Sequence, residues 1–355
     1  MNIKWLIKTL SIVLVLFIVM STVAYIVDPF FIYRHNAERE YWLQPDYTSM
    51  GLIMNAEYDT VIVGSSMTQN FNAEKFGDAV GGDVLKVNSG GLTVTEMCEY
   101  VDLIKDTGKA EKYYICIDLH LFAKAAKEDT NRFREELCDG NVLNDFEYLL
   151  GFETWMRFVP VDLGLVLIDT IGYEYPEALK QKTDVDRAGE WANDFVYGAD
   201  IVWKGYTNGT NRISVIDTNG LYDRMVERFS ELMNIIEGDS AEYTFFFAPY
   251  SALYWYDSKQ CGYYDDFMKA KEYMAEELLA DGHEVVDFQS MEYISDLDNY
   301  RDISHYSGEI TELMTADFAD GSNRINTVEE IRASIAKQSE IIDSFAKENK
   351  DILGK

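Results

Sequence analysis

Apolar residues fall into one long run near the N-terminus and several short runs farther along the chain. The long run covers residues 5–27, where Lys8 is the single charged residue. About 20 apolar residues are enough for a helix to span a bilayer. A secretory signal peptide is the competing interpretation, because residues 21–24 offer a weak cleavage site. Its apolar region is usually only about 7–15 residues long. Length therefore favours an uncleaved transmembrane signal anchor.

The charges around this run predict its orientation. Lys4 and Lys8 lie on its N-terminal side, and acidic Asp28 follows it. The positive-inside rule then places the N-terminus in the cytoplasm. We expect residues 1–30 to form a cytoplasmic tip and anchor in the plasma membrane, and residues 31–355 to form an extracytoplasmic domain. Residues 28–35, which are rich in aromatic side chains, would lie at the membrane interface.

Short β-branched runs alternate with helical patterns in the next part of the chain. Strands are predicted over residues 58–63, 84–87 and 113–117, with helical stretches beginning near Asn72 and ending near Asp106. Such alternation is typical of right-handed crossovers in a parallel sheet. We therefore expect an α/β fold.

This alternation lapses over residues 123–237, a segment rich in aromatic, acidic and helix-forming residues, with Pro160 and Pro176 as breaks. A mostly helical insertion is the interpretation. The later elements are expected to be helices over residues 221–236, 264–280 and 327–352 and strands over residues 243–248 and 283–288. A helix is also expected after Ser307.

Composition narrows the class of protein. The 355 residues include 31 Lys and Arg against 62 Asp and Glu, a formal net charge of −31. Nucleic acid is excluded as a partner because phosphate binding needs clustered basic residues. Hydrophobic residues make up 47% of the chain, too many for a disordered acidic protein. The four cysteines form no CxxC pair, so no zinc site is expected; one disulfide remains open, without a choice of partners.

Three loops that follow strands carry candidate chemistry. Ligands bind at the carboxyl ends of parallel strands, so these loops would meet at one edge of the sheet. Ser66 lies in a Gly-Ser-Ser turn after the first strand, and Gly90 and Gly91 follow the second. Near the end of the sheet domain, Asp302 lies three residues before His305. Ser66, His305 and Asp302 are the three residue types of a catalytic Ser-His-Asp triad. Each motif alone, however, also fits an ordinary turn or helix cap.

The blocks VIVGSSMT, NSGGLT and DISHYS, in this order, resemble those of the SGNH or GDSL hydrolase superfamily. Within it, the chain is similar to the membrane-anchored branch that includes the D-alanyl transfer protein of lipoteichoic acid modification and polysaccharide O-acetyltransferases. The resemblance covers residues 56–122 and 240–318. It implies a three-layer α/β/α sheet of the SGNH or flavodoxin-like kind, without a metal or dissociable cofactor.

The resemblance also assigns roles within the site. It implies that Ser66 is the nucleophile, His305 the base and Asp302 the acid that orients it. The Ser66 amide and Gly91, in preference to Gly90, would form the oxyanion hole. The implied partner is a multispanning membrane acyltransferase.

The third block departs from the family pattern. An asparagine that donates to the oxyanion is expected after the third strand, where this chain has Asp118 and, two residues on, His120. A carboxylate cannot donate as an amide does, and losing one donor in a comparable site costs about 10²–10³ in rate. Asp118 is either a cap at the end of the strand or an accessory group of the site. His120 is a second candidate for an accessory group. The departure favours transfer to a polymer over free hydrolysis.

Aromatic residues after Pro249 form a further candidate, expected in a loop near the site: Tyr250, Tyr254, Trp255 and Tyr256. Their rings could stack on sugars, but packing between sheet and insertion is the preferred interpretation.

The first hypothesis is thus an anchored esterase or O-acyltransferase that uses an acyl donor and a surface glycan or teichoic acid acceptor. A non-catalytic assembly or binding partner of an acyl-transfer machinery is the alternative, and a secreted lipase is a weaker one. All acidic residues follow residue 27, so the extracytoplasmic domain carries the negative charge. A negative domain would repel an anionic acceptor such as teichoic acid. The acceptor therefore stays open.

Overall fold

A computed structural model describes residues 3–35, 45–129, 131–172 and 195–354 of the chain. The chain divides into two compact units. The N-terminal unit comprises Met1–Ala56 and Arg132–Asp184, and the sheet unit comprises Glu57–Asn131 and Val185–Lys355. Each unit is described by itself below.

The sheet unit is built on a six-stranded sheet with the strand order β2-β1-β3-β4-β5-β6. The neighbours from β2 to β5 pair in parallel, and β6 joins β5 antiparallel. The α/β expectation is confirmed, but the sheet is mixed and not wholly parallel. Its strands are β1 Thr60–Gly64, β2 Val84–Asn88, β3 Lys112–Ile117, β4 Glu242–Phe247, β5 Glu284–Asp287 and β6 Arg324–Ile325.

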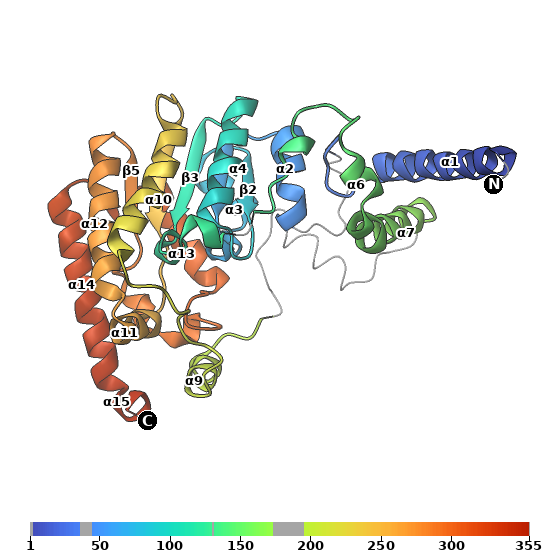
Figure 1. Cartoon of the computed structure of the whole chain (residues 1–355). Coiled ribbons are helices and arrows are strands. Elements are labelled where there is room, and N and C mark those ends of the chain that lie inside the picture. The colour runs from blue at the N-terminus through green and yellow to red at the C-terminus, as the bar shows by residue number, and fades with distance from the viewer. Residues whose placement is uncertain (1–2, 36–44, 130, 173–194, 355) are drawn as a thin grey trace. The chain divides into compact units, whose positions relative to one another are not determined.

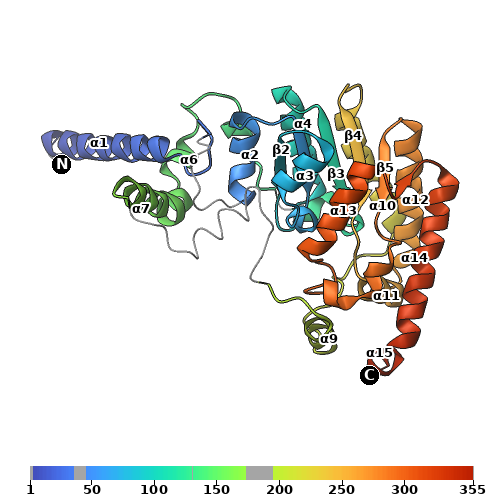
Figure 2. The same ribbon diagram turned by 180° about the vertical axis from the view of Figure 1, so that it is seen from behind.

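Helices cover the central strands, which explains why those strands are apolar runs without alternation. All five residues of β1 are buried, as are the last five of β4, the pattern of strands covered on both faces. Figure 1 shows one group of helices in front of the sheet, and Figure 2 shows a second group on the opposite side. The first group is α4 Val94–Thr107, α10 Leu221–Ile236 and α12 Tyr264–Ala280; the second is α3 Ala73–Val80 and α13 Gly308–Asp320.

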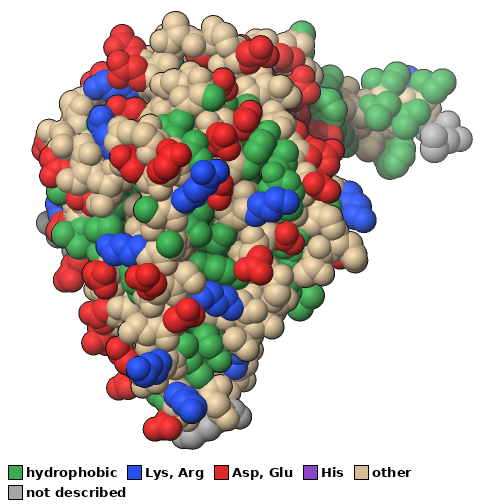
Figure 3. Space-filling view, turned by 90° about the vertical axis from the view of Figure 1, so that its left-hand side faces the viewer, with side chains coloured by type: hydrophobic (Ala, Val, Ile, Leu, Met, Phe, Trp, Pro, Cys, Tyr) green, Lys and Arg blue, Asp and Glu red, His purple; other side chains and the backbone are tan. Residues whose placement is uncertain are grey.

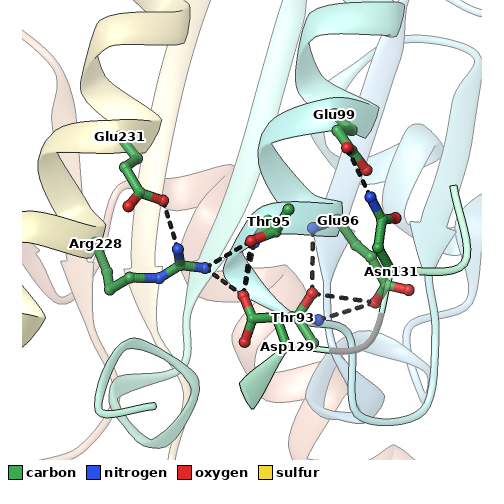
Figure 4. Close-up of polar contacts among 8 residues, drawn as sticks. All are labelled: Thr93, Thr95, Glu96, Glu99, Asp129, Asn131, Arg228 and Glu231. Atoms are coloured by element: carbon green, nitrogen blue, oxygen red, sulfur yellow. Dashed lines mark hydrogen bonds and ion pairs between the residues drawn. The ribbon is translucent and has the colours of Figure 1, made fainter. Parts of the chain in front are cut away.

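The N-terminus of α4 is fixed by a polar network (Figure 4). Thr93 and Glu96 form a reciprocal capping box that satisfies two backbone N–H groups. The guanidinium of Arg228, on α10, pairs with Asp129 and donates to Thr95 Oγ1 at 3.0 Å. This arginine is buried, and its charge is balanced by two carboxylates because Glu231 Oε2 lies 2.6 Å away. The network joins α10 to the start of α4, which directly follows the loop after β2.

A second buried ion pair joins α12 to the end of β5. Lys271 Nζ lies 2.7 Å from Asp287 Oδ2, and both side chains are fully buried. Ser334, on α14 Val328–Glu348, donates to the same carboxylate at 2.5 Å. Burial lowers the pKa of Lys271, against the opposing effect of Asp287. The three elements are therefore held together by a charge pair shielded from solvent.

Most expected elements of the sheet unit match the structure within two residues, and α10 and α12 have the expected bounds. Neither β6 nor α11 Ala252–Cys261 was expected. The remaining helices here are α5 Leu119–Phe122, α9 Ala199–Thr207 and α15 Lys350–Leu353. Helices α6, α7, α9 and α10 lie within residues 123–237, but the insertion's limits stay a prediction, and Pro176 lies outside the described residues.

The N-terminal unit contains α1 Ile3–Val27, α2 Pro45–Asn55, α6 Phe146–Leu150, a π-helical turn Thr154–Phe158 and α7 Val159–Thr170. Helix α1 is long and apolar enough to cross a membrane. The end of α1 is fixed by the buried Asp28, whose carboxylate accepts backbone N–H groups at 2.9–3.1 Å from Ile32, Tyr33 and Arg34. Tyr148, on α6, donates to the same carboxylate at 2.9 Å. The chain after α1 is thus folded back onto α6.

Acidic side chains are spread over the side of the sheet unit on which α12 and α14 lie (Figure 3). Fewer Lys and Arg side chains lie between them (Figure 3). Several of these basic groups pair with acids, as Arg332 does with Glu272 at 2.7 Å. The excess of acids leaves this face negative.

Candidate functional site

Ser66 lies at the sharp turn that leaves β1. Ser65 caps the turn, because its hydroxyl accepts from Met67 N at 3.3 Å, and Ser66 is the first residue of the 3₁₀ turn Ser66–Thr68. Gly64 is required for this turn. A Cβ at Gly64 would lie only 2.4 Å from Thr68 Cγ2. The Gly-Ser-Ser sequence therefore packs the turn against the strand and leaves the Ser66 side chain partly exposed.

Ser66 meets His305 across 239 residues of sequence. Ser66 Oγ lies 2.8 Å from His305 Nε2, and His305 Nδ1 lies 2.7 Å from Asp302 Oδ2. A proton on Nδ1, facing the carboxylate, leaves the Nε2 lone pair free to accept the serine hydroxyl proton. The three residues thus have the connectivity that activates a serine nucleophile.

Asp302 is held in place by the loop that carries it. Its Oδ1 accepts the backbone N–H groups of Ser304 and His305, both at 2.8 Å. Burial opposes ionisation of the carboxyl, but the hydrogen bond and charge of His305 and the two N–H groups hold its pKa below the usual value. Asp302 is therefore an anion that orients the histidine ring.

Two further hydrogen bonds fasten the His305 loop to the Ser66 turn. The Tyr306 hydroxyl donates to Met67 O, and Asn70 Nδ2 donates to Tyr306 O at 2.6 Å. Tyr306 is buried. These hydrogen bonds thus hold the loop of His305 against the turn of Ser66.

Gly91 lies on the wall of a cavity of about 260 Å³ that also contains Ser66, Asp302 and His305. Its φ of +67° is left-handed, and an added Cβ would meet no atom within 4 Å. Glycine is favoured there by conformation. Gly90 precedes it and is exposed, but it does not line the cavity. Of the two candidates, Gly91 is thus the one beside the serine.

Asp118 lies beside the triad but does not contact it. Its carboxylate caps α5 by accepting from His120 N at 3.1 Å, and it also accepts from Ser65 Oγ at 3.0 Å and from the Tyr250 hydroxyl. Burial, with the nearby Asp118 charge, raises the pKa of Tyr250 well above its usual value, so this hydroxyl stays protonated as a donor. The strand-end capping contact is present, and Ser65 faces Asp118 while Ser66 faces His305.

His120 contacts the aromatic group and not the triad. Its Nδ1 lies 3.1 Å from the Tyr254 hydroxyl. Burial, aided by the Lys124 charge and opposed by Asp118, lowers the pKa of His120. The His120 side chain is therefore a neutral imidazole in the wall of the cavity.

Neither the chain nor any part of it matches a family model, and no curated protein matches it. The chemistry of the site therefore rests on its geometry. In the part of the chain that the structure describes, no group of three or more His, Cys, Asp or Glu side chains could hold a metal ion.

The polar residues of the cavity that the sequence did not single out include Lys124, Asn211 and Arg212. Arg212 Nη1 lies 3.0 Å from Asp257 Oδ1, and its guanidinium lies over the Tyr206 ring, 3.4 Å from the centroid. All three come from the segment without regular alternation, so no strand-end pattern marked them. They give an acidic chain two cations beside the serine.

Three of the four aromatic residues after Pro249 are buried and Tyr256 is half-buried; packing between sheet and insertion stays a prediction. Trp255 is fully buried, and Tyr250 and Tyr254 stack with ring centroids 4.1 Å apart. The expected loop ends early, because Tyr254, Trp255 and Tyr256 lie on α11, which Ser251 caps by accepting from Tyr254 N at 3.2 Å. Of the four, Tyr250 and Tyr254 line the cavity. The four cysteines are free.

Proposed function

We propose that the chain is a membrane-anchored serine esterase or O-acyltransferase that works outside the cytoplasm. The observation that carries the proposal is the connected chain of Ser66, His305 and Asp302, with Oγ–Nε2 and Nδ1–Oδ2 distances of 2.8 and 2.7 Å. Residues widely separated in sequence meet in the order that acyl transfer requires, at the carboxyl ends of the strands.

The reaction would run in two steps through an acyl-enzyme. His305 takes the proton of the Ser66 hydroxyl as Oγ attacks the acyl carbonyl of the donor, and then gives that proton to the leaving group. The backbone N–H groups of Ser66 and Gly91 would stabilise the oxyanion. In the second step, His305 deprotonates an acceptor hydroxyl, which attacks the acyl-enzyme; the proton returns to Ser66 Oγ.

The family and the finer fold belong to this proposal as well. Helices on both sides of a largely parallel sheet, and a serine turn directly after β1, support a three-layer SGNH-like domain. Helix α1 supports a single-pass anchor in the plasma membrane, with the N-terminus in the cytoplasm as its flanking lysines predict.

Asp118 supports transfer in preference to rapid hydrolysis. Its position holds a hydrogen-bond acceptor where the related enzymes place an amide donor, so stabilisation of the oxyanion is reduced. The acceptor would be a surface glycan or teichoic acid hydroxyl. Overall negative charge opposes an anionic polymer, whereas Lys124 and Arg212 offer local positive charge at the cavity. A multispanning membrane acyltransferase is the proposed partner, and no metal or cofactor is required.

The test is covalent trapping on the purified full-length chain in detergent micelles. Incubation with p-nitrophenyl acetate is expected to give an adduct of acetyl mass, which peptide mapping locates at Ser66. The adduct should be lost in Ser66→Ala and His305→Ala. Ser295→Ala is the matched control and should keep the adduct, because the Ser295 hydroxyl donates within its own turn, to Glu292 O at 2.8 Å, and does not line the cavity.

A folded protein without an adduct or turnover would overturn the catalytic proposal. Asp118 would then favour the alternative, a non-catalytic SGNH-like assembly partner of an acyl-transfer machinery. In cells that depend on the protein, Ser66→Ala should abolish its phenotype at normal abundance; an assembly partner would tolerate the change.

A further inference from the structure

The segment comprising residues 143–171 exposes a long series of apolar side chains. Its members with substantial solvent exposure are Leu143, Phe146, Phe152, Met156, Val161, Leu163, Leu167 and Ile171. Leu143 is 91% exposed, Phe152 80% and Ile171 71%. Singly exposed apolar residues are ordinary, but so many large ones within one short segment indicate a surface that is covered by another.

This apolar segment packs directly on the apolar helix α1. Both α6 and α7 contact α1 within the N-terminal unit, and both views show α7 running beside its C-terminal part (Figures 1 and 2). Aromatic side chains form part of the contact between the end of α1 and this segment. Phe30, just after α1, makes an edge contact with Phe158 at 4.8 Å between ring centroids, and its N–H donates to the Tyr148 hydroxyl at 3.2 Å.

We infer that residues 143–171 enter the bilayer beside α1, in the leaflet at its C-terminal end. This inference rests on the proposed membrane anchoring. Most of α1 is exposed on every side, so acyl chains surround it once it spans a membrane. An element packed on the apolar length of α1 lies at the same depth. The exposed patch is therefore continuous with a lipid-facing surface.

The distribution of charge in the segment fits partial insertion. The exposed ionic groups that the structure describes in this segment come before α7. Among them, Glu153 and Arg157 pair at 3.3 Å, within reach of headgroups. Trp155, a residue type enriched at membrane interfaces, lies between them in sequence, and its indole N–H donates to Leu149 O at 2.8 Å. On α7 the acids are Asp162 and Asp169, and the Asp162 side chain is only 1% exposed.

Helix α7 alone is too short for a second span, because its 12 residues extend about 18 Å at 1.5 Å per residue, against a bilayer core of about 30 Å. The helical run continues back through the π-helical turn to Phe152, but that part carries the charged pair Glu153 and Arg157, which favours the headgroup region over the core. Helix α7 thus enters one leaflet and ends there, and its apolar side chains add to the hold of α1 on the membrane.

Lipid photolabelling tests this placement. The purified full-length chain is reconstituted in phosphatidylethanolamine–phosphatidylglycerol vesicles containing a phospholipid with a diazirine in its acyl chain, and labelled peptides are mapped. We expect label in α1 and in residues 146–171, and none in the sheet unit. Label in α1 alone would overturn the inference but keep the anchor. Absence of label from both would overturn the inference and the anchoring together.

Thiol accessibility gives an independent result with a matched control. Leu167→Cys and Val215→Cys both replace exposed apolar residues, but Val215, 96% exposed, lies in the sheet unit. Reaction with a charged, impermeant maleimide is measured relative to the native exposed Cys261 in the same chain. Leu167→Cys should react at least about tenfold more slowly than Val215→Cys, because acyl chains exclude the reagent. Equal rates, or disulfide-linked dimers through Leu167→Cys, would reject lipid as the occupant.

Discussion

Asp302 acts on His305 through both of its oxygens. One oxygen accepts from the ring and the other from two backbone N–H groups of the same loop. The ring and the loop are therefore oriented by a single carboxylate. A change at this residue that keeps the shape but removes the charge separates its electrostatic role from its role in folding.

Asp302→Asn is expected to lower the rate of Ser66 acylation by about 10⁴-fold, the loss seen for this change in a comparable triad. The amide oxygen can still accept the two backbone N–H groups. The amide nitrogen, however, donates to Nδ1 and places the ring proton on Nε2, where it can no longer accept from Ser66. Stopped-flow release of p-nitrophenol measures the rate. Asp298→Asn, in the same region, is the control, and a loss below tenfold would contradict the role of Asp302.

The same residue gives a pH-dependent contribution to stability. The pKa of Asp302 is below its ordinary value of 3.8 in the folded chain, so the folded state prefers the ionised form. This contribution is complete above the ordinary pKa and is lost as the pH falls through the lower folded pKa. The difference in melting temperature between the wild-type chain and Asp302→Asn should therefore shrink below about pH 4. A difference that grows on acidification would refute the assignment.

At the scale of elements, the buried pair of Lys271 and Asp287 joins α12 to β5 and, through Ser334, to α14. Desolvation of two charges offsets much of their attraction, so the pair is a weak source of net stability. Removal of one partner should destabilise the fold more than removal of both, because a single remaining charge would be buried and unpaired.

Lys271→Met should lower the free energy of unfolding of the sheet unit by about 3–5 kcal/mol. Lys271→Met combined with Asp287→Asn should recover part of the loss, since no buried charge remains. Arg332→Met, which breaks the exposed pair with Glu272, should cost at most about 1 kcal/mol. Urea unfolding followed by far-ultraviolet circular dichroism checks all three. A double variant less stable than Lys271→Met would contradict this account.

The five long strands could be predicted because each is an apolar run bounded by turn residues, and β1–β5 have nearly the expected limits. Strand β6 could not, because two residues, Arg324 and Ile325, form no pattern and pair only through tertiary contact. Helix α11 was missed because most of its residues, polar and apolar alike, are buried, so its apolar positions do not gather on one face. The capping signal of Ser251 was present in the sequence.

The candidate site was predictable only as residue types at strand ends. Ser66, Gly91 and His305 could be singled out because each follows a strand or an acid at a characteristic spacing. Their contacts depend on the tertiary arrangement of distant loops. The pairing of Ser65 with Asp118, and the cations of the cavity, come from side-chain directions and an irregular segment that periodicity does not describe.

At the scale of the whole molecule, a net charge of −31 is a source of self-repulsion. Surface acids outnumber basic partners, and folding brings them closer together than they are in the unfolded chain. Salt screens this repulsion, because the Debye length falls from about 30 Å at 0.01 M to about 10 Å at 0.1 M.

The melting temperature of the full-length chain in a non-ionic detergent should therefore rise with sodium chloride at neutral pH. Differential scanning fluorimetry checks this. Near the ordinary pKa of Asp and Glu, about 4, the same addition of salt should have a smaller effect because many carboxylates are neutral. A melting temperature that does not change with salt at neutral pH would show that repulsion between surface acids is not a significant cost.

The 239 residues between Ser66 and His305 also set when the site can exist. During synthesis Ser66 is made well before His305, because 239 residues of sequence separate them. Contacts of such long range close a large loop and form late in folding. A chain that has not yet reached His305, or that is truncated before it, therefore carries a Ser66 hydroxyl without its histidine partner, and the contact forms only after the sheet unit has folded.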